Sequence, residues 1–339
     1  MNSKQRVYNA LLRKTVDRSP RFLWLGGTAA QMIAEKEGIP PEEVNAFIGN
    51  DIMQTWLSIN GQMERPAAEG ETFEDEWGIT WKRQGYYNSP VSHPLSGYDA
   101  EKITRYPFPN PRAQERFAAL DALIDKYGKT HFIGADISGS LFEPAYHLRS
   151  MEELLMDMVA GEPEAHILLD RVCEFTGDVA EEALKRDIDW VWLGDDVGTQ
   201  QDMIMSPALW REWLKPRMAK LIQRIRGCRP DAIIAYHSCG SVWPIVADLV
   251  EIGINVLNPV QESAVGMNQE AIKSQYGSTL TLMCGVDTQQ FLPSASPEAV
   301  KKAVMEKDAK LSNGGGYILA VSHSVQPDVP LENMYALFL

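Results

Sequence analysis

Short runs of β-branched and aromatic residues recur along this chain, and longer amphipathic stretches separate them. Strands that alternate with helices in this way favour a parallel sheet with crossover helices. Eight is the number of strands that closes a barrel. The sequence therefore predicts one α/β domain over residues 1–339, a (β/α)8 TIM barrel, with strands at 21–25, 52–57, 131–136, 190–195, 232–237, 254–258, 280–286 and 317–322.

The helices between these runs carry their own signals. Ser206-Pro207 and Ser296-Pro297 each place a capping oxygen before a proline, which is typical of a helix start. Residues 170–185 and 299–311 have apolar residues at helical spacing. We expect these helices to pack on the outside of the barrel.

Residues 58–111 interrupt the alternation. Glycine, proline, tryptophan and tyrosine crowd together around residues 74–78 and 106–109. A long segment without strand or helix periodicity inside a compact domain is usually a lid or a binding loop. We predict an irregular insertion between the second and third strands that covers the mouth of the barrel.

Composition excludes several classes of function. The formal net charge of −14 would repel a phosphate backbone, so nucleic acid is not an expected partner. No apolar run is long enough for a membrane span, and the first 18 residues form a charged amphipathic stretch rather than a signal peptide. We expect a cytoplasmic protein with no membrane partner.

The strongest chemical signal is His237-Ser-Cys239, at the end of a strongly apolar strand. Residues two apart in a strand point the same way, so both side chains should face the barrel mouth. Imidazole and thiolate are good zinc ligands. His323 ends the last strand and is the expected third ligand, and Cys284 is the alternative. A packed histidine beside an inert thiol is the competing structural explanation.

Asp195 and Asp196 end another apolar strand. Because adjacent strand residues point to opposite sides, only one of them should face the pocket, and the other should cap or brace a loop. The pocket-facing carboxylate could hold substrate, complete a metal shell or act as a general acid. A purely structural role in the turn is the alternative.

Further polar side chains recur where successive strands end. We expect them to position a substrate in an otherwise apolar cup, although turns also favour such residues. Trp24, Trp56 and Tyr236 are expected to supply the apolar walls. The polar candidates are Asn258, Gln261, Asp287, Gln289 and Gln326.

Six motifs in this order resemble the uroporphyrinogen decarboxylase superfamily from Val7 to Leu337, and more closely its corrinoid-dependent methyltransferase branch. They are residues 194–200, 237–240, 253–261, 285–289, 314–319 and 330–333. The branch has a zinc motif, His-X-Cys followed much later by Cys. The resemblance matches the first two ligands to His237 and Cys239, whereas the last falls on His323 instead of a cysteine.

The resemblance implies a zinc-dependent methyltransferase that moves a methyl group between a small O-, N- or S-methyl compound, such as an aryl methyl ether, and the corrinoid (cobalamin) of a partner protein. Asp195 or Asp196 would orient or protonate the leaving atom. Decarboxylases of the superfamily resemble one another in an arginine-containing segment that receives substrate carboxylates, but residues 22–30 contain no arginine.

Two other functions remain as alternatives. The first is a metal-free decarboxylase of a tetrapyrrole-like or other carboxylated substrate, with Asp195 or Asp196 as its acid. The second is a non-catalytic barrel that delivers a corrinoid or porphyrin. Homodimers are common among such barrels, so a homodimer is a further expectation.

Overall fold

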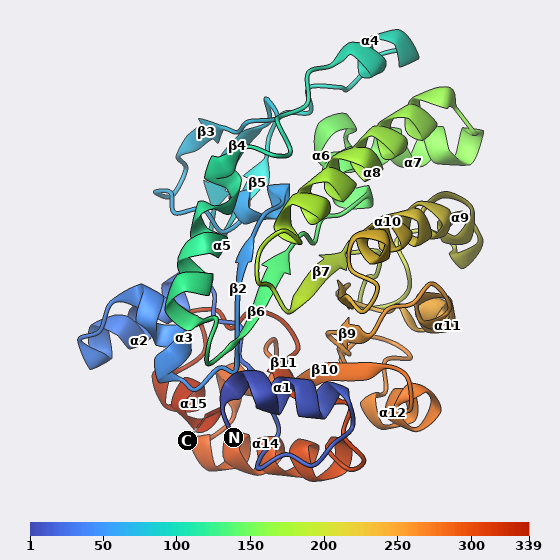
Figure 1. Cartoon of the computed structure of the whole chain (residues 1–339). Coiled ribbons are helices and arrows are strands. Elements are labelled where there is room, and N and C mark those ends of the chain that lie inside the picture. Colours follow the sequence, from blue (N-terminus) through green and yellow to red (C-terminus); the bar gives the residue numbers. More distant parts are fainter. Residues whose placement is uncertain (339) are drawn as a thin grey trace.

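The computed structural model describes residues 1–338 and contains eight parallel strands in a nearly closed barrel (Figure 1), as the sequence predicts. The order of hydrogen-bonded neighbours is β1-β11-β10-β9-β8-β7-β6-β2. The strands are β1 (Arg21–Phe22), β2 (Ile52–Trp56), β6 (Phe132–Asp136), β7 (Trp190–Gly194), β8 (Ile233–His237), β9 (Val256–Asn258), β10 (Thr281–Val286) and β11 (Tyr317–Val321).

The gap between β1 and β2 is bridged by the two residues that precede β2. The Asp51 backbone N–H donates to the Arg21 carbonyl at 2.9 Å. The Asn50 side chain accepts from the Leu23 N–H at 2.7 Å and donates to the Leu23 carbonyl at 3.1 Å. A side chain thus replaces part of the missing strand ladder and holds the barrel closed.

Side chains alternate between the barrel interior and the layer under the helices. On β7, Trp190 and Trp192 belong to the interior cluster, whereas Val191 and Leu193 pack toward the helices. Helix α1 (Ser3–Leu11) adds Val7 and Leu11 to the interior cluster. Its backbone hydrogen-bonds to Thr130 and Gly316, which lie just before β6 and β11. Helix α1 therefore covers the amino-terminal end of the barrel and leaves the other end for a site.

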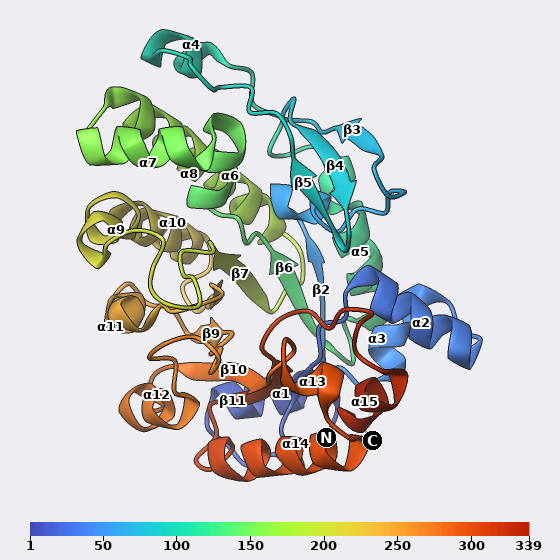
Figure 2. The ribbon, with the colours of Figure 1, turned by 180° about the vertical axis from the view of Figure 1, so that it is seen from behind.

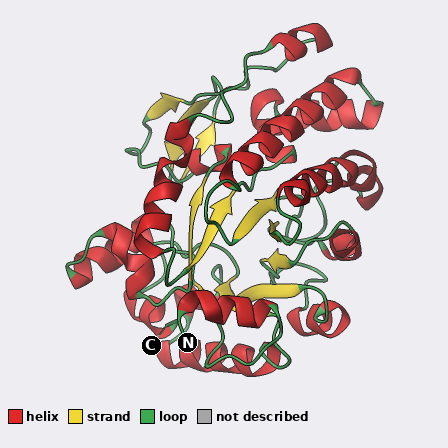
Figure 3. Ribbon diagram, in the orientation of Figure 1, coloured by secondary structure: helices red, strands yellow, loops and turns green. Residues whose placement is uncertain are grey.

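The remaining helices surround the strands (Figure 3). Ser206 and Ser296 cap α9 and α14 with proline at the first helical position, as predicted. The helices are α2 (Gly27–Glu37), α3 (Val44–Phe47), α4 (Ala100–Arg105), α5 (Gln114–Tyr127), α6 (Phe142–Arg149), α7 (Met151–Ala160), α8 (Pro163–Ala183), α9 (Pro207–Trp213), α10 (Lys215–Cys228), α11 (Val246–Glu251), α12 (Gln269–Tyr276), α13 (Phe291–Ser294), α14 (Pro297–Leu311) and α15 (Leu331–Ala336). Among residues 1–338, no helix has the length and apolarity needed to cross a membrane.

The insertion between β2 and β6 is more regular than the sequence predicts. It contains a three-stranded antiparallel sheet of β3 (Thr72–Glu74), β4 (Thr80–Gln84) and β5 (Tyr87–Pro90), which stands beside the barrel in Figure 2. Trp77 and Trp81 anchor it in the main hydrophobic core. The abundance of glycine and proline marks its turns, and the strands between them are too short for periodicity to reveal.

Candidate active site

Neighbouring strand ends bring the central polar residues together. Within the sheet, Gly194 of β7 lies beside His237 of β8, which lies beside Asn258 of β9. His237 and Asn258 point into the barrel, because they follow the alternation that places Ala235 and Val256 in its interior. Asp196 follows β7 and reaches the same end of the barrel.

Asp196, His237 and Cys239 form a compact group of metal-capable side chains. The His237 Nε2 atom lies 3.6 Å from Asp196 Oδ1 and 3.5 Å from Cys239 Sγ. One donor atom from each residue lies within 4.8 Å of the other two. Tetrahedral zinc bonds of about 2.0–2.3 Å separate neighbouring ligand atoms by about 3.5 Å. The donor types and spacings therefore fit zinc with one position left open.

The surrounding residues fix the orientation of this group. Asn258 Oδ1 lies 2.8 Å from His237 Nδ1 and makes it the protonated nitrogen, which leaves the Nε2 lone pair free. Asp196 accepts from the Cys239 N–H at 2.7 Å, and Gln261 accepts from the Gly240 N–H at 2.9 Å. Gly240 has φ +78°, and a Cβ there would lie 2.5 Å from the Gly198 backbone. Only glycine fits this turn.

Nearby negative charge affects the ionisation of the Cys239 thiol. Burial, together with the carboxylates of Asp196 and Glu143, raises the pKa of Cys239 well above its usual range. The thiol is therefore protonated when no cation is nearby. A divalent cation would reverse this balance, because it stabilises the thiolate directly.

The structure separates the two candidates for the third ligand. His323 lines the same cavity as His237, and its ring stacks on Trp24 with centroids 5.8 Å apart. It nevertheless lies outside the compact group, in which Asp196 takes the third place. The Cys284 side chain points away from the barrel interior and belongs to the cluster under the helices.

Asp195 and Asp196 divide their roles as the alternation predicts. The Asp195 carboxylate is buried and accepts from the N–H groups of Leu141 and Glu143 at 3.0 Å each, at the start of α6. Its place is structural, and Asp196 is the carboxylate that faces the cavity. The structure thus places Asp195 at the start of α6 and Asp196 at the cavity.

Two expected substrate-binding residues lie elsewhere. Tyr236 directly precedes His237, points the opposite way and is buried in the cluster under the helices. Asp287 accepts from the N–H groups of Gln290 and Phe291 at 2.8 and 3.0 Å, at the start of α13. Strand alternation accounts for Tyr236, and the preference of aspartate for helix starts accounts for Asp287. Gln289 is exposed.

The cavity beside the metal-capable group has walls that sequence reasoning missed. Its volume is about 50 Å³, several times the roughly 10–15 Å³ that one water needs. Trp24 and Trp56 pack with ring centroids 5.5 Å apart. The lining residues not expected from the sequence are Asn60, Met63, Glu64, Tyr87, Ser138 and Glu143.

Most of these unexpected residues belong to the insertion, and only the tertiary packing of the chain brings them to the cavity. Glu143 follows the Asp195-capped turn, and its Oε2 atom accepts from the Asp196 N–H at 3.3 Å and from Asn60 at 3.2 Å. Burial and the nearby carboxylates of Asp196 and Asp195 raise its pKa well above the usual range. The insertion therefore contributes part of the wall and Glu64 to the site, and the start of α6 contributes Glu143.

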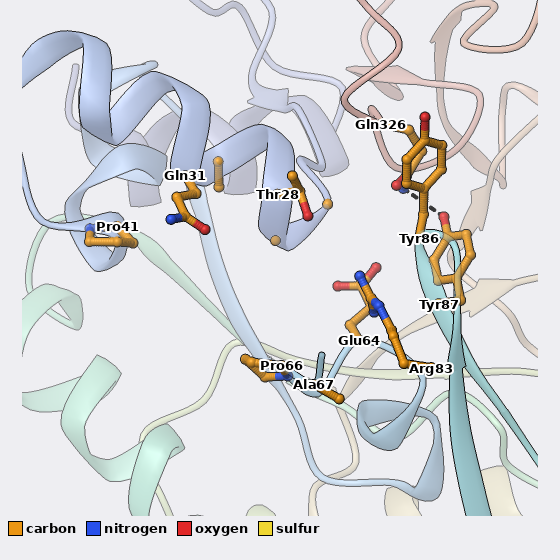
Figure 4. A pocket seen from close by; sticks show the side chains of 13 residues that line it. Thr28, Gln31, Pro41, Glu64, Pro66, Ala67, Arg83, Tyr86, Tyr87 and Gln326 are labelled. Carbon is orange, nitrogen blue, oxygen red and sulfur yellow. Dashed lines mark hydrogen bonds between the residues drawn. The ribbon is translucent and has the colours of Figure 1, made fainter. Parts of the chain in front are cut away.

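A larger pocket of about 460 Å³, drawn in Figure 4, adjoins this cavity. It lies between the start of α2, the insertion and Gln326, which donates to the Tyr87 hydroxyl at 2.6 Å. Glu64 and Tyr87 line both spaces. The inner cavity is thus adjacent to a mouth that can admit a second, larger molecule.

Residues 82–338 match the protein family described as Uroporphyrinogen decarboxylase (URO-D). The chain belongs to this family. Among solved structures, a methyltransferase from Methanosarcina mazei is similar with a TM-score of 0.76 and 20% identity, over 99% of this chain and 97% of that one. An intracellular xylanase from Thermoanaerobacterium saccharolyticum has a TM-score of only 0.39 and 12% identity, over 72% of this chain and 92% of that one. No curated protein has significant sequence similarity.

The family match confirms the resemblance that the six motifs carry. The similarity to the Methanosarcina protein concerns the fold, which extends across the whole URO-D domain and the segment before residue 82. Residues 1–81 supply β1, β2 and Glu64, so they belong to the same barrel as the matched part. The family and the barrel are therefore shown independently by sequence and by structure.

Proposed function

We propose that this URO-D family protein is a zinc-dependent methyltransferase that transfers a methyl group between a small methylated compound and a corrinoid carried by a partner protein. One observation carries the proposal: an imidazole, a thiol and a carboxylate meet at the barrel mouth with separations that suit zinc. The Methanosarcina structure of the same fold is itself described as a methyltransferase, which supports the same reading.

In this proposal, Asp196, His237 and Cys239 hold the metal. Bound zinc supplies Lewis acidity at the heteroatom that carries the methyl group. Asn258 keeps the His237 imidazole in the tautomer that presents Nε2, and Gln261 holds the Cys239–Gly240 turn in place. His323 and Trp24 form part of the cavity wall beside His237, where they exclude water and restrict the position of the substrate.

The ligand set favours O-methyl or N-methyl substrates. Cys239 is the single thiol of the compact group, and Asp196 adds a hard oxygen ligand. A zinc ion with one thiolate is a stronger Lewis acid than a zinc ion with two, because less electron density reaches it. Polarisation of an ether oxygen therefore suits this site better than activation of a thiol. Aryl methyl ethers are our first candidates, because aromatic side chains line both spaces.

A metal-free decarboxylase is the second candidate, because the family takes its name from that activity. The placement of Asp195 counts against it, since this carboxylate is engaged in capping α6. A decarboxylase would turn over carboxylated substrates without zinc and without a corrinoid.

Methyl transfer to cobalt(I) tests the proposal. Zinc-loaded protein is mixed with a reduced free corrinoid and methoxybenzenes, and the visible spectrum of the corrinoid is followed. We expect conversion of cobalt(I) to the methylated form with the wild-type protein. We expect a loss of at least about 100-fold with His237→Ala. Equal rates for the two proteins, or no methylation with any O-, N- or S-methyl donor, would contradict it.

A further inference from the structure

Glu64 lies where three spaces meet. It lines the inner cavity with His237, the mouth pocket with Arg83, and a third pocket with Asp136 and Gln54 at the end of the barrel interior. In Figure 4 its side chain lies beside Arg83, between α2 and the β4–β5 hairpin. Its position is therefore between the metal-capable group and the open mouth.

The contacts of Glu64 leave its carboxyl group available to a ligand. Trp24 lines two of these spaces together with Glu64, and the positive charge of Arg83 favours the ionised carboxylate. Burial outweighs this effect and raises the pKa of Glu64 to about 7. The carboxyl group thus lies at the edge of the cavity and keeps a proton to a much higher pH than an exposed glutamate.

We propose that Glu64 is the catalytic acid that protonates the leaving oxygen when an O-methyl substrate gives up its methyl group. This inference rests on the proposed methyl transfer. The methyl carbon accepts the electron pair of cobalt(I) from the reduced corrinoid while the carbon–oxygen bond breaks. The bonding pair remains on oxygen, which takes the proton of Glu64. The product is an alcohol or phenol, and the Glu64 carboxylate recovers a proton from water in the mouth pocket.

Other acidic groups suit this role less well. Asp136 lines only the third pocket and is hydrogen-bonded to Ser138 and Gln54. Glu143 lines the inner cavity but does not reach the mouth pocket, so it lacks the route for proton return that Glu64 has. Burial raises the pKa of Tyr87 to about 12, which makes it a weak acid. The titratable groups that line these spaces with Glu64 are Arg83, Tyr86, Tyr87, Asp136, Glu143, Asp196, His237 and His323.

Single-turnover methyl transfer with Glu64→Gln tests the assignment. Glu69→Gln is the matched control, because Glu69 is an exposed glutamate in the same insertion. The donors are methoxybenzene and methoxybenzenes with electron-withdrawing substituents, whose phenols leave without needing a proton. We expect Glu64→Gln to slow transfer from methoxybenzene by about 10²–10⁴-fold and transfer from the activated donors far less. Glu69→Gln should resemble the wild type.

The pH dependence gives a second readout. An acid must carry its proton, so wild-type transfer from methoxybenzene should fall as the pH rises through about 7. This decrease in rate with rising pH should be absent in Glu64→Gln. If Glu64→Gln slowed transfer equally from every donor, or kept the pH profile of the wild type, Glu64 would only shape the site. That result would overturn the assignment of Glu64 as the acid but not the proposed methyl transfer. No transfer by the wild type with any donor would instead overturn the proposed function and this assignment with it.

Discussion

At the scale of single residues, the hydrogen bond between His237 and Asn258 decides which imidazole nitrogen can bind a metal. Replacing Asn258 with alanine removes the acceptor at Nδ1 and lets the ring rotate or change tautomer. We expect zinc affinity to fall by about 10–100-fold, measured by competition with a chromophoric chelator. Asn258→Asp keeps the acceptor and should stay within a few-fold of the wild type. Unchanged affinity in Asn258→Ala would contradict the orienting role of Asn258.

His147 lies outside the candidate active site, and its burial should make the stability of the protein depend on pH. Burial lowers its pKa to about 3, and neither ring nitrogen has a hydrogen-bond partner within residues 1–338. Because the folded pKa lies below the unfolded value of 6.5, the stability that the neutral ring contributes is complete above 6.5 and declines as the pH falls toward 3.

Urea unfolding at several pH values measures this effect. Between pH 6.5 and about pH 4, we expect the wild type to lose about 2–3 kcal/mol more than His147→Leu. His166→Gln is the control, because His166 is exposed and should follow the wild type. Parallel curves for the wild type and His147→Leu would refute the prediction.

At the scale of elements, the turn after β7 gives two adjacent carboxylates opposite tasks. Asp195→Ala removes a buried acceptor from two N–H groups at the start of α6 and should lower the free energy of unfolding by about 1–3 kcal/mol, with zinc still bound. Asp196→Ala should lose zinc with little change in stability, since its side chain is 38% exposed. Calorimetry and metal analysis of both variants test this division, and the reverse pattern would contradict it.

The sequence predicts elements best where periodicity acts over several residues. All eight barrel strands and the proline-marked starts of α9 and α14 could be predicted, because alternation and capping are local. The hairpin of the insertion could not, since β3 to β5 are short and gain their stability from Trp77 and Trp81 in the core. His237 and Cys239 could be found from strand spacing. Glu64 and Glu143 could not, because only tertiary packing brings them to the cavity.

At the scale of the whole molecule, barrel closure depends on Asp51. This carboxylate is buried and pairs with Arg6 of α1 at 2.5 Å and with Arg18 at 2.7 Å, while it accepts from the Arg21 N–H at 2.9 Å. It therefore joins the covering helix to the first two strands. Asp51→Ala should lower the free energy of unfolding by about 1–3 kcal/mol, because the Arg21 N–H loses its acceptor and Arg6 and Arg18 each lose a carboxylate partner.

Asp17→Asn is the matched control for Asp51, because Asp17 pairs with the same Arg6 at 2.7 Å but is 44% exposed. We expect the melting temperature of this variant to stay close to that of the wild type. If Asp51→Ala were as stable as Asp17→Asn, the closure of the barrel would have to depend on other contacts.

The central claim is that Asp196, His237 and Cys239 bind a metal ion, and metal analysis of the purified protein tests it most directly. Wild type, Cys239→Ala and Cys228→Ser are loaded with zinc and dialysed, and their metal content is measured after circular dichroism has shown that each is folded. Cys228 is the control, because it is an exposed cysteine at the end of α10. We predict about one zinc per chain in the wild type and Cys228→Ser, and none in Cys239→Ala. Zinc retained by folded Cys239→Ala, or absent from all three proteins, would contradict the account.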